Sequence, residues 1–490
     1  VMPFPAGNHP IQVTLANFGA NTITNTTIQW SVNGVEQTPH SWNGSLSSGT
    51  KESDIVIGNY SFVSGEKTVF KIWQSDPNGE QDGYALNDTL NKTLFTALCG
   101  TYTLGGSSPD FESFTEVATA LNNAGVACPV IFEVRDGIYD EQIKLYEISG
   151  ASATNTITFR GENRDSSLVE LHYTTSNPSN DFALAIAGTD FISFEDMSVL
   201  RTNGTYSVLI QNESNHVRFE SCRLGSVVSP ATSVDGPLSF ISNNLEGYDM
   251  NLQQGVESLT GEINIENNYL RYLTITNSSP INVQNNHINS LHLVACNGGQ
   301  VNGNTINRSQ AYTHLRGFYC ENSEQLDITS NLIEQHGYNN KVYGIELVGG
   351  HDLRIRTNNI DLHNGAGTGQ IGMIIRGEIR RIDIEENRIR YYDDGSWGTR
   401  YGILVDRTDS VNIVGNDLDG RNFGIAGQGI VCKNIVGWLS VRSNLVKNYR
   451  NYGIYTQGSD PGNNYRVSNN QIEAIRDLGI LYEGENGIFT

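Results

Sequence analysis

Arg376, Asp406 and Lys433 occupy the same place in three successive copies of a repeated pattern. Each lies four residues after the glycine that opens a short, alternating apolar strand. Parallel strands stack about 4.8 Å apart, so the three side chains would lie within about 10 Å of one another. A basic residue beside a carboxylate could remove a proton from a uronic acid and drive β-elimination. These three residues are therefore the catalytic candidates.

Aromatic and acidic residues gather in the segments that lead into these strands. Rings beside carboxylates and cations are typical of surfaces that bind sugars. The competing interpretation is a row of paired surface charges with the rings packed on the coils, which needs no ligand. The ligand-binding candidates are His363, Tyr391, Tyr392, Asp393, Asp394 and Trp397.

The elements that must position these residues repeat along the chain. Each copy has an alternating strand opened by Gly, a second alternating strand, and then Asn-x-Ile or Asn-x-Leu. A supersecondary unit that recurs at such a period is typical of a solenoid, and units made of strands predict a parallel β-helix. The Asn recurs every 18 to 29 residues, at Asn244 (or Asn243), Asn268, Asn286, Asn304, Asn331, Asn358, Asn387, Asn416, Asn444 and Asn470.

The repeated Asn is expected to be structural. A tight turn between two strands needs a residue that tolerates positive φ, and Asn does so. Side-chain amides stacked about 4.8 Å apart can also hydrogen-bond along the column. The Asn column therefore predicts one edge of the solenoid and not a substrate site.

The strand before each Asn predicts an outward face of alternating charge. Alternation sends every second side chain to solvent, and one such column reads Asp327, Arg354, Asp383 on successive coils. Opposite charges on neighbouring strands attract each other. We therefore expect a ladder of surface ion pairs here, each contributing little where it is exposed.

The composition is typical of a soluble extracellular protein. A net charge of −22 over 490 residues argues against nucleic acid or an anionic membrane as partner. The 51 Gly and only 4 Met suit many tight turns and few helices. No apolar run approaches the ~18 residues of a membrane span. We expect no cofactor, and calcium is the one metal that the acidic side chains would suit.

Six cysteines are too few for a disulfide-dense scaffold. Cys99 and Cys128 are the expected disulfide pair, at the entrance to the coils. Cys320 and Cys432 fall at inward positions and are expected to be small apolar fillers. The Cys and His spacings do not fit a zinc site.

The chain is expected to divide into three parts. Residues 1–95 alternate with period two between turn residues, which predicts an Ig-like β-sandwich. Residues 96–130 form a linker, where Ser108 and Pro109 precede an apolar stripe and predict a short capping helix. Residues 131–490 hold the coils. Their unfinished pattern predicts that they continue beyond residue 490, in a trimmed piece of a longer secreted protein.

Four short stretches in the first part carry a resemblance. The stretches Val13–Gly19, Ser31–Gly34, Leu46–Gly49 and Asp76–Leu90 resemble the CARDB-type, cell-adhesion-related module of bacteria. The resemblance covers most of residues 8–95. It implies a spacer or an adhesion unit.

A second resemblance covers residues 98–490. Leu98–Gly106, Asp136–Tyr139 and Ile148–Phe159 are similar to a family of secreted right-handed parallel β-helix proteins of Bacteroidetes type. The resemblance implies right-handed coils and export by the type IX secretion route. Most members of that family have no assigned activity, so it implies fold and location far better than chemistry. The Gly-His-Gly and Arg-Ile-Lys runs of hydrolase-type pectinases are absent.

Two functional hypotheses follow from these patterns. The first is a secreted or cell-surface structural protein, adhesin-like and non-catalytic, that binds an extracellular glycan or another surface protein. Self-association into filaments stays open. The alternative is a polysaccharide lyase or glycoside hydrolase that acts on an acidic glycan in a groove over the Gly-led strands.

Overall fold

The computed structural model describes most of the chain as two compact units, Val1–Val134 with Leu145–Phe159, and Arg135–Lys144 with Arg160–Thr490. The residues outside this description are 1–2, 83, 85–86, 175–181, 203–205, 231–235, 255–260, 309–314, 338–340, 365–368, 393–398, 422–426, 459–463, 484–486 and 490. Asp393, Asp394 and Trp397 therefore lie outside the described residues. Strands dominate both units, which confirms the all-β class.

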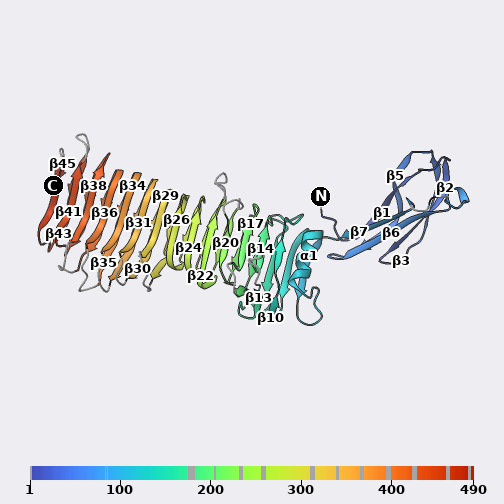
Figure 1. Cartoon of the computed structure of the whole chain (residues 1–490), viewed down its shortest axis with the longest axis horizontal. Helices are drawn as coiled ribbons and strands as arrows, with labels where there is room; N and C mark the ends of the chain where they lie inside the picture. The colour runs from blue at the N-terminus through green and yellow to red at the C-terminus, as the bar shows by residue number, and fades with distance from the viewer. Residues whose placement is uncertain are drawn as a thin grey trace. The chain divides into compact units, whose positions relative to one another are not determined.

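The first unit begins with an antiparallel β-sandwich (Figure 1). Its core is a cluster of inward residues that includes Trp30, Phe62 and Phe70, so this tryptophan packs inside. The first sheet pairs β1 (Gly7–Ala16) with β5 (Lys51–Phe62). The second contains β2 (Ile23–Val32), β3 (Val35–Glu36), β4 (His40–Leu46), β6 (Lys67–Ser75) and β7 (Thr89–Phe95), with a 3-10 turn η1 (Pro77–Gly79) after β6.

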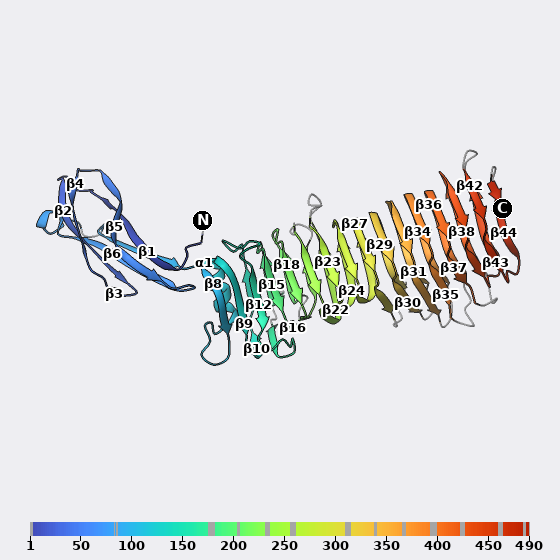
Figure 2. The same cartoon turned by 180° about the vertical axis from the view of Figure 1, so that it is seen from behind.

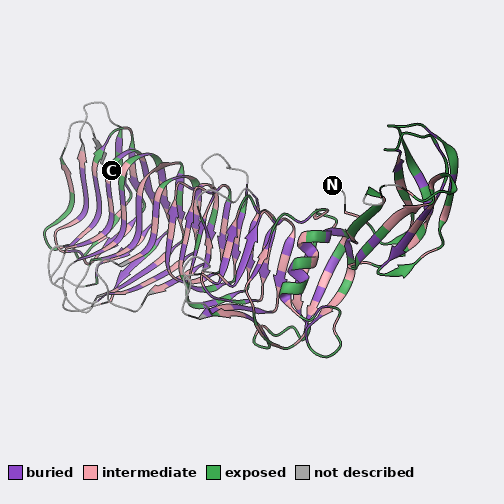
Figure 3. Cartoon of the chain, turned by 45° about the vertical axis from the view of Figure 1, so that its right-hand side comes forward, coloured by how far each residue is buried: buried purple, intermediate pink, exposed green. Residues whose placement is uncertain are grey.

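A helix and a disulfide complete the first unit. The disulfide joins Cys99 to Cys128, with an S–S distance of 2.11 Å. Helix α1 (Phe114–Ala124) buries one face, as Figure 3 shows, and Phe114 stacks on Phe159 with ring centroids 5.8 Å apart. Parallel strands β8 (Leu98–Leu104) and β9 (Val126–Val134) flank it in sequence.

The predicted start of this helix was wrong. Ser108 has φ 48° and cannot cap a helix at Pro109. The cap is Ser113, whose hydroxyl accepts a hydrogen bond from the Glu116 backbone N–H at 3.1 Å. The Glu116 carboxylate in turn accepts from the Glu112 backbone N–H at 2.8 Å. These two bonds satisfy N–H groups that the helix cannot, so the helix begins at Phe114.

The second unit is a right-handed parallel β-helix, as the sequence predicted (Figures 1 and 2). In each winding a first strand, opened by Gly in the later coils, leads to a second strand, an Asn corner and a third strand. One winding holds β31 (Val342–His351), β32 (Leu353–Arg356) and β33 (Asn359–Asn364). These pair in parallel with β34 (Gln370–Glu385) and β35 (Arg388–Tyr391) of the next winding.

The other strands occupy the same three positions. First strands are β11 (Ile143–Leu145), β14 (Leu184–Ala187), β17 (Val208–Gln211), β20 (Val227–Ser229), β38 (Gly427–Ile435), β41 (Tyr452–Gly458) and β44 (Leu478–Glu483). Second strands are β12 (Ile157–Gly161), β15 (Ile192–Glu195), β18 (Val217–Glu220), β21 (Leu238–Ile241), β23 (Ile263–Glu266), β25 (Ile281–Gln284), β27 (Asn297–Asn302), β39 (Leu439–Arg442), β42 (Tyr465–Ser468) and β45 (Gly487–Phe489). Third strands are β10 (Gly137–Asp140), β13 (Val169–Thr174), β16 (Ser198–Thr202), β19 (Arg223–Leu224), β28 (Thr305–Arg308), β30 (Leu332–Gly337), β37 (Asp417–Asp419), β40 (Leu445–Lys447) and β43 (Gln471–Glu473). Longer strands that span two positions are β22 (Asn244–Gln253), β24 (Tyr269–Thr276), β26 (His287–Val294), β29 (Leu315–Thr329) and β36 (Arg400–Val414).

The interior of the solenoid is closely packed. Phe194, Phe219 and Phe240 stack on successive windings with ring centroids 5.1 and 5.4 Å apart. The Gly that opens each later first strand lies where windings approach closely: a Cβ at Gly372 would come within 2.6 Å of the Gly402 carbonyl oxygen. Only glycine fits such an approach without moving backbone. The free thiols within the described chain, Cys222, Cys296, Cys320 and Cys432, are all buried.

The repeated Asn forms one continuous ladder of buried amides. At each step the side-chain Nδ2 and the backbone N–H both donate to Oδ1 of the next Asn, for example from Asn331 to Asn358 at 2.9 Å each. Nδ2 donates a second hydrogen bond to a backbone carbonyl, for Asn358 that of Ile328 at 2.8 Å. The members are Asn243, Asn268, Asn286, Asn304, Asn331, Asn358, Asn387, Asn416, Asn444 and Asn470.

Two details of the predicted Asn corner need correction. The ladder includes Asn243, and Asn244 instead begins the following strand. The positive φ falls one residue before the ladder Asn, at Thr357 (53°) and Glu386 (55°). Asn is therefore selected at this slot for its amide, which supplies two N–H donors and a separate acceptor oxygen, whereas a Ser or Thr hydroxyl supplies only one donor.

Truncating one rung of this ladder should destabilise the windings around it. Asn358→Ala removes the acceptor of two buried donors of Asn331. Each buried donor left without a partner costs about 1–3 kcal/mol. We expect the opening free energy of β30–β35, measured by native-state hydrogen exchange, to fall by about 2–5 kcal/mol. Asn302→Ala removes an outward amide whose one side-chain hydrogen bond in the described chain is accepted from Thr329, and it should lower the same opening free energy by less than about 1 kcal/mol. An equal decrease in opening free energy in the two variants would contradict a special role for the ladder.

Candidate functional site

The catalytic candidates lie in one column on three adjacent first strands. Arg376 of β34 is opposite Asp406 of β36, and Asp406 is opposite Lys433 of β38. Parallel strand spacing puts neighbouring members of the column about 4.8 Å apart at the backbone. The windings therefore bring together the three residues that the repeat aligned in sequence.

Each of the three side chains has a partner outside the column. Arg376 forms an ion pair with Glu346, on the preceding winding. Asp406 accepts a hydrogen bond from Asn434 Nδ2 at 2.8 Å, and Lys433 Nζ lies 5.2 Å from the centroid of the Tyr455 ring. Within the described residues, no hydrogen bond or ion pair joins the three candidates to one another.

Glu346 is the buried centre of a charged triad. It faces away from the solenoid interior, yet its side chain is only 1% exposed. Arg316 of β29 and Arg376 of β34, one winding away on either side, both form ion pairs with it. Arg316 Nε and Glu346 Oε2 form an ion pair but not a hydrogen bond, so this contact is charge–charge in character. We call Arg316, Glu346 and Arg376 the arginine clamp.

Tyrosines line the first-strand face beside the clamp. Tyr343, Tyr401 and Tyr452 occupy one outward column, on alternate windings. Tyr319 and Tyr455 occupy the column of Glu346. Burial raises the pKa of Tyr319 and of Tyr455 to about 12, helped by hydrogen bonds to Glu321 and Glu483. These phenols stay neutral at physiological pH, and each already donates its hydroxyl proton to a neighbouring carboxylate.

A row of stacked rings lies on the third-strand face. The His336 and His363 rings are 4.3 Å apart at 13°, and His363 and Tyr392 are 4.5 Å apart at 8°. The guanidinium of Arg421 lies 5.1 Å from the Tyr392 centroid. Because each ring covers the face of the next, the row exposes ring edges to solvent. A sugar that stacks on an aromatic face would find few free faces here.

Tyr391 does not belong to this surface, so its assignment as a ligand-binding residue needs correction. Alternation along β35 sends it inward, and it is fully buried. Its hydroxyl donates to the backbone carbonyl of Tyr401. Burial raises its pKa well above the usual value.

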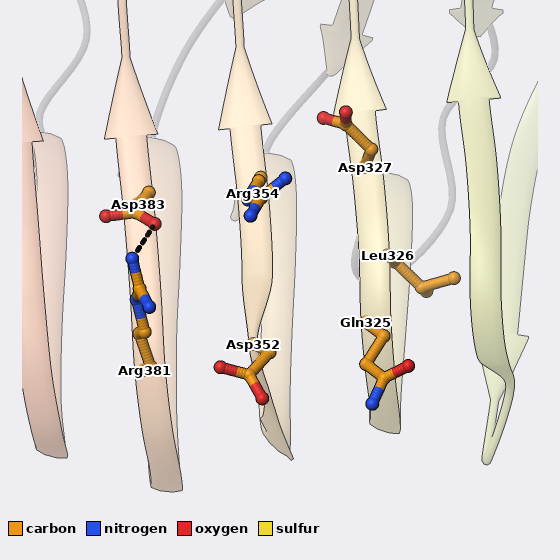
Figure 4. Close-up of a pocket in the computed structure, with 7 residues that line it drawn as sticks. All are labelled: Gln325, Leu326, Asp327, Asp352, Arg354, Arg381 and Asp383. Carbon is orange, nitrogen blue, oxygen red and sulfur yellow. Dashed lines mark hydrogen bonds and ion pairs between the residues drawn. The ribbon is translucent and has the colours of Figure 1, made fainter.

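The second-strand face carries the expected charge ladder (Figure 4). Asp327, Arg354 and Asp383 lie in register on three windings around a hollow of about 310 Å³. The ion pairs form differently from the prediction: Arg356 pairs with Asp327, and Arg381 with Asp383 at 3.4 Å. Arg354 is left between two engaged carboxylates, without a hydrogen bond or ion pair in the described chain.

The described residues contain no group of three or more His, Cys, Asp or Glu side chains placed to hold a metal ion. Among their helices, none has the length and apolar character needed to cross a bilayer.

The comparisons with known proteins identify no family. No family model and no curated protein matches the chain. Solved structures similar to it include the catalytic unit of a GH87 alpha-1,3-glucanase from Streptomyces thermodiastaticus strain HF3-3, at 11% identity and a TM-score of 0.35, covering 100% of this chain and 88% of that one. A mannuronic acid specific polysaccharide family 6 lyase from human gut microbiota has 12% identity and a TM-score of 0.28, over 66% and 86% of the chains. A Yersinia enterocolitica family 28 exopolygalacturonase has 9% identity and a TM-score of 0.25, over 100% and 98%. These likenesses carry no argument about activity.

Sequence reasoning did not single out Arg316 or Glu346. Alternation places Glu346 outside the solenoid, where an acidic residue is ordinary. Its burial arises from two arginines that reach diagonally from the neighbouring windings. The repeat aligns residues straight across the strands and therefore carries no sign of diagonal contacts.

The clamp should contribute more stability than an exposed ion pair. Glu346→Ala leaves two partly buried arginines without their shared carboxylate, and breaking a buried pair costs about 3–5 kcal/mol. Asp249→Ala is the matched control, because Asp249 pairs with Arg271 at 2.7 Å while both side chains are over 40% exposed. Loss of this exposed ion pair should lower the free energy of unfolding by less than about 1 kcal/mol. Denaturant unfolding of both variants measures the difference, and a Glu346→Ala cost no larger than the control would contradict the burial argument.

Proposed function

We propose that the chain is a secreted or cell-surface, adhesin-like β-helix protein that binds a glycan along its first-strand face without transforming it. The observation that carries the proposal is the line of outward tyrosines, Tyr343, Tyr401 and Tyr452, beside charges that already have partners. The CARDB-like identity of the sandwich and its role as an adhesion unit belong to the same proposal.

The spacing of the tyrosines suits an extended chain of sugars. They lie on alternate windings, so neighbouring rings are about 10 Å apart along the solenoid. Ile371 and Gln428 occupy the same column between them and keep the rings from stacking on one another. A half-buried tyrosine offers an apolar ring for the C–H face of a sugar and a hydroxyl for its polar groups.

The engagement of the charged groups favours binding over catalysis. A general base must be free to take a proton from its substrate. Asp406 already accepts from Asn434, and its other oxygen lies 3.6 Å from Arg407. Arg376 is already engaged in an ion pair with Glu346. The column therefore resembles a network of ion pairs more than a set of poised catalytic groups.

The alternative is a polysaccharide lyase or glycoside hydrolase acting on an acidic glycan. The observation that favours it is the register that places Arg376, Asp406 and Lys433 on adjacent windings. Substrate binding that displaced Asn434 would free Asp406 to act as a base. Product analysis separates the two functions.

A glycan panel tests the proposed function. Neutral and acidic oligosaccharides are titrated against the protein by calorimetry, and each mixture is then assayed for new reducing ends and unsaturated sugars. We expect binding without products. Tyr401→Ala should weaken binding roughly tenfold by removing a stacking ring. Tyr269→Ala, an exposed third-strand tyrosine stacked on His287, is the control and should change nothing.

Two results would overturn binding as the function. One is the absence of binding to every member of the panel. The other is product formation that disappears in an Asp406→Asn variant, which would establish the enzymatic alternative.

A further inference from the structure

The arginine clamp has hydrogen-bonding capacity beyond what Glu346 uses. Arg316 contacts Glu346 through Nε, and Arg376 through Nη2. A guanidinium carries five N–H donors in one plane, so each arginine keeps several. The two side chains are 36% and 44% exposed, so part of each guanidinium reaches the surface. Within the described chain neither has another side-chain hydrogen-bond partner.

The charges in the clamp do not cancel. Two guanidinium groups share one carboxylate, which leaves one positive charge in excess. A partly buried excess charge interacts with an incoming anion more strongly than a fully solvated one, because the local dielectric is lower. The clamp is therefore electrostatically suited to one further anionic group.

Neighbouring groups hold the clamp in place before any ligand arrives. The Arg316 guanidinium lies 4.5 Å from the centroid of Tyr319, and the Tyr319 hydroxyl donates to Glu321 at 2.7 Å. Arg376 is fixed by its ion pair to a carboxylate that is itself buried. Side chains ordered in advance lose less conformational entropy when a ligand binds.

We propose that Arg316 and Arg376 together bind the carboxylate of a uronic acid within the glycan held on the first-strand face. This inference rests on the proposed function and adds the chemical class of one subsite. A carboxylate presents two oxygens in a plane and matches the donor fork of a guanidinium. Tyr343, opposite Arg316 on the next winding, lies beside the clamp and can contact the sugar ring.

The surroundings restrict the ligand to isolated carboxylates. Glu321 lies two windings before Arg376 in the same column, and Asp406 follows on the next winding. A second anionic sugar beside the first would meet one of these carboxylates. The net charge of −22 adds to this repulsion. A mainly neutral glycan with occasional uronic acids therefore fits better than a dense polyanion.

A pair of monosaccharide probes tests the clamp without knowledge of the glycan backbone. Methyl β-D-glucuronoside and methyl β-D-glucoside differ only in carrying a carboxylate or a hydroxymethyl group. Both are titrated against the full chain by NMR. Wild type should bind the glucuronoside about tenfold more tightly. Methyl glucoside 6-sulfate and trigalacturonate serve as further arms. A sulfate that binds as tightly as the carboxylate, or a trigalacturonate that binds more tightly than the glucuronoside, would overturn the restriction to isolated carboxylates.

Variants on one strand separate the clamp from general electrostatics. Arg376→Gln should remove the preference for the glucuronoside and leave the glucoside unaffected. Arg381→Gln, on the same strand β34 but paired with Asp383 on the second-strand face, should leave the preference intact. The inference is overturned if Arg376→Gln and Arg381→Gln change the preference for the glucuronoside equally. It is also overturned if Arg376→Gln weakens the binding of both probes equally.

Three further outcomes each have a distinct meaning. If Arg376→Gln fails to fold, the Arg Nε–H signals of the wild-type protein are followed instead, and the glucuronoside must shift two of them where the glucoside does not. If wild type binds both probes equally, the clamp inference fails while glycan binding stands. If neither the probes nor any glycan of the panel binds, both the clamp inference and the proposed function fail.

Discussion

The column of buried amides at the Asn corner is the constraint on which the other features of the solenoid depend. Parallel strands alone could slide along one another, and a slip of one residue would exchange inward and outward side chains. Each ladder Asn must meet the next with both its amide and its backbone N–H, as at Asn331 and Asn358. A slip would leave several buried donors unpaired, at about 1–3 kcal/mol each. The register of Arg376, Asp406 and Lys433 is a consequence of this column.

Charge is distributed differently over the faces of the solenoid. On the second-strand face both members of the Arg356–Asp327 pair keep contact with water, at 39% and 29% exposed, so this pair contributes less to stability than a buried one. On the first-strand face Glu346 is buried and has two cationic neighbours. Removing a carboxylate from water is costly unless it is well compensated, and two arginines provide that compensation. A change of charge at Glu346 should therefore have larger consequences than one on the second-strand face.

Repetition in the sequence predicted the features that repeat in space. Alternation and the Asn slot gave the windings, the inward Cys320 and the column of Arg376, Asp406 and Lys433. Side-chain reach was not predictable in this way. The diagonal contacts of Arg316 and Arg376 with Glu346 depend on side-chain conformations that periodicity does not encode.

Other errors came from local competition between neighbouring residues. Ser108 and Ser113 both precede apolar residues, and only Ser113 has Glu three residues later to complete the cap. The positive φ of the Asn corner is taken by the residue before the ladder Asn, because the Asn itself must point its amide inward. In both cases a correct motif was assigned to the wrong member of a pair.

The two aromatic surfaces show why ring spacing matters more than ring number. His336, His363 and Tyr392 lie on consecutive windings, and strand spacing then forces their faces together at 4.3 to 4.5 Å. Tyr343 and Tyr401 lie on alternate windings, with Ile371 between them. In the His336, His363 and Tyr392 row the ring faces cover one another. Tyr343 and Tyr401 do not stack on each other, so their ring faces stay available to a ligand. A solenoid that binds sugars by stacking should therefore carry the rings of one column on every second winding, as Tyr343 and Tyr401 do.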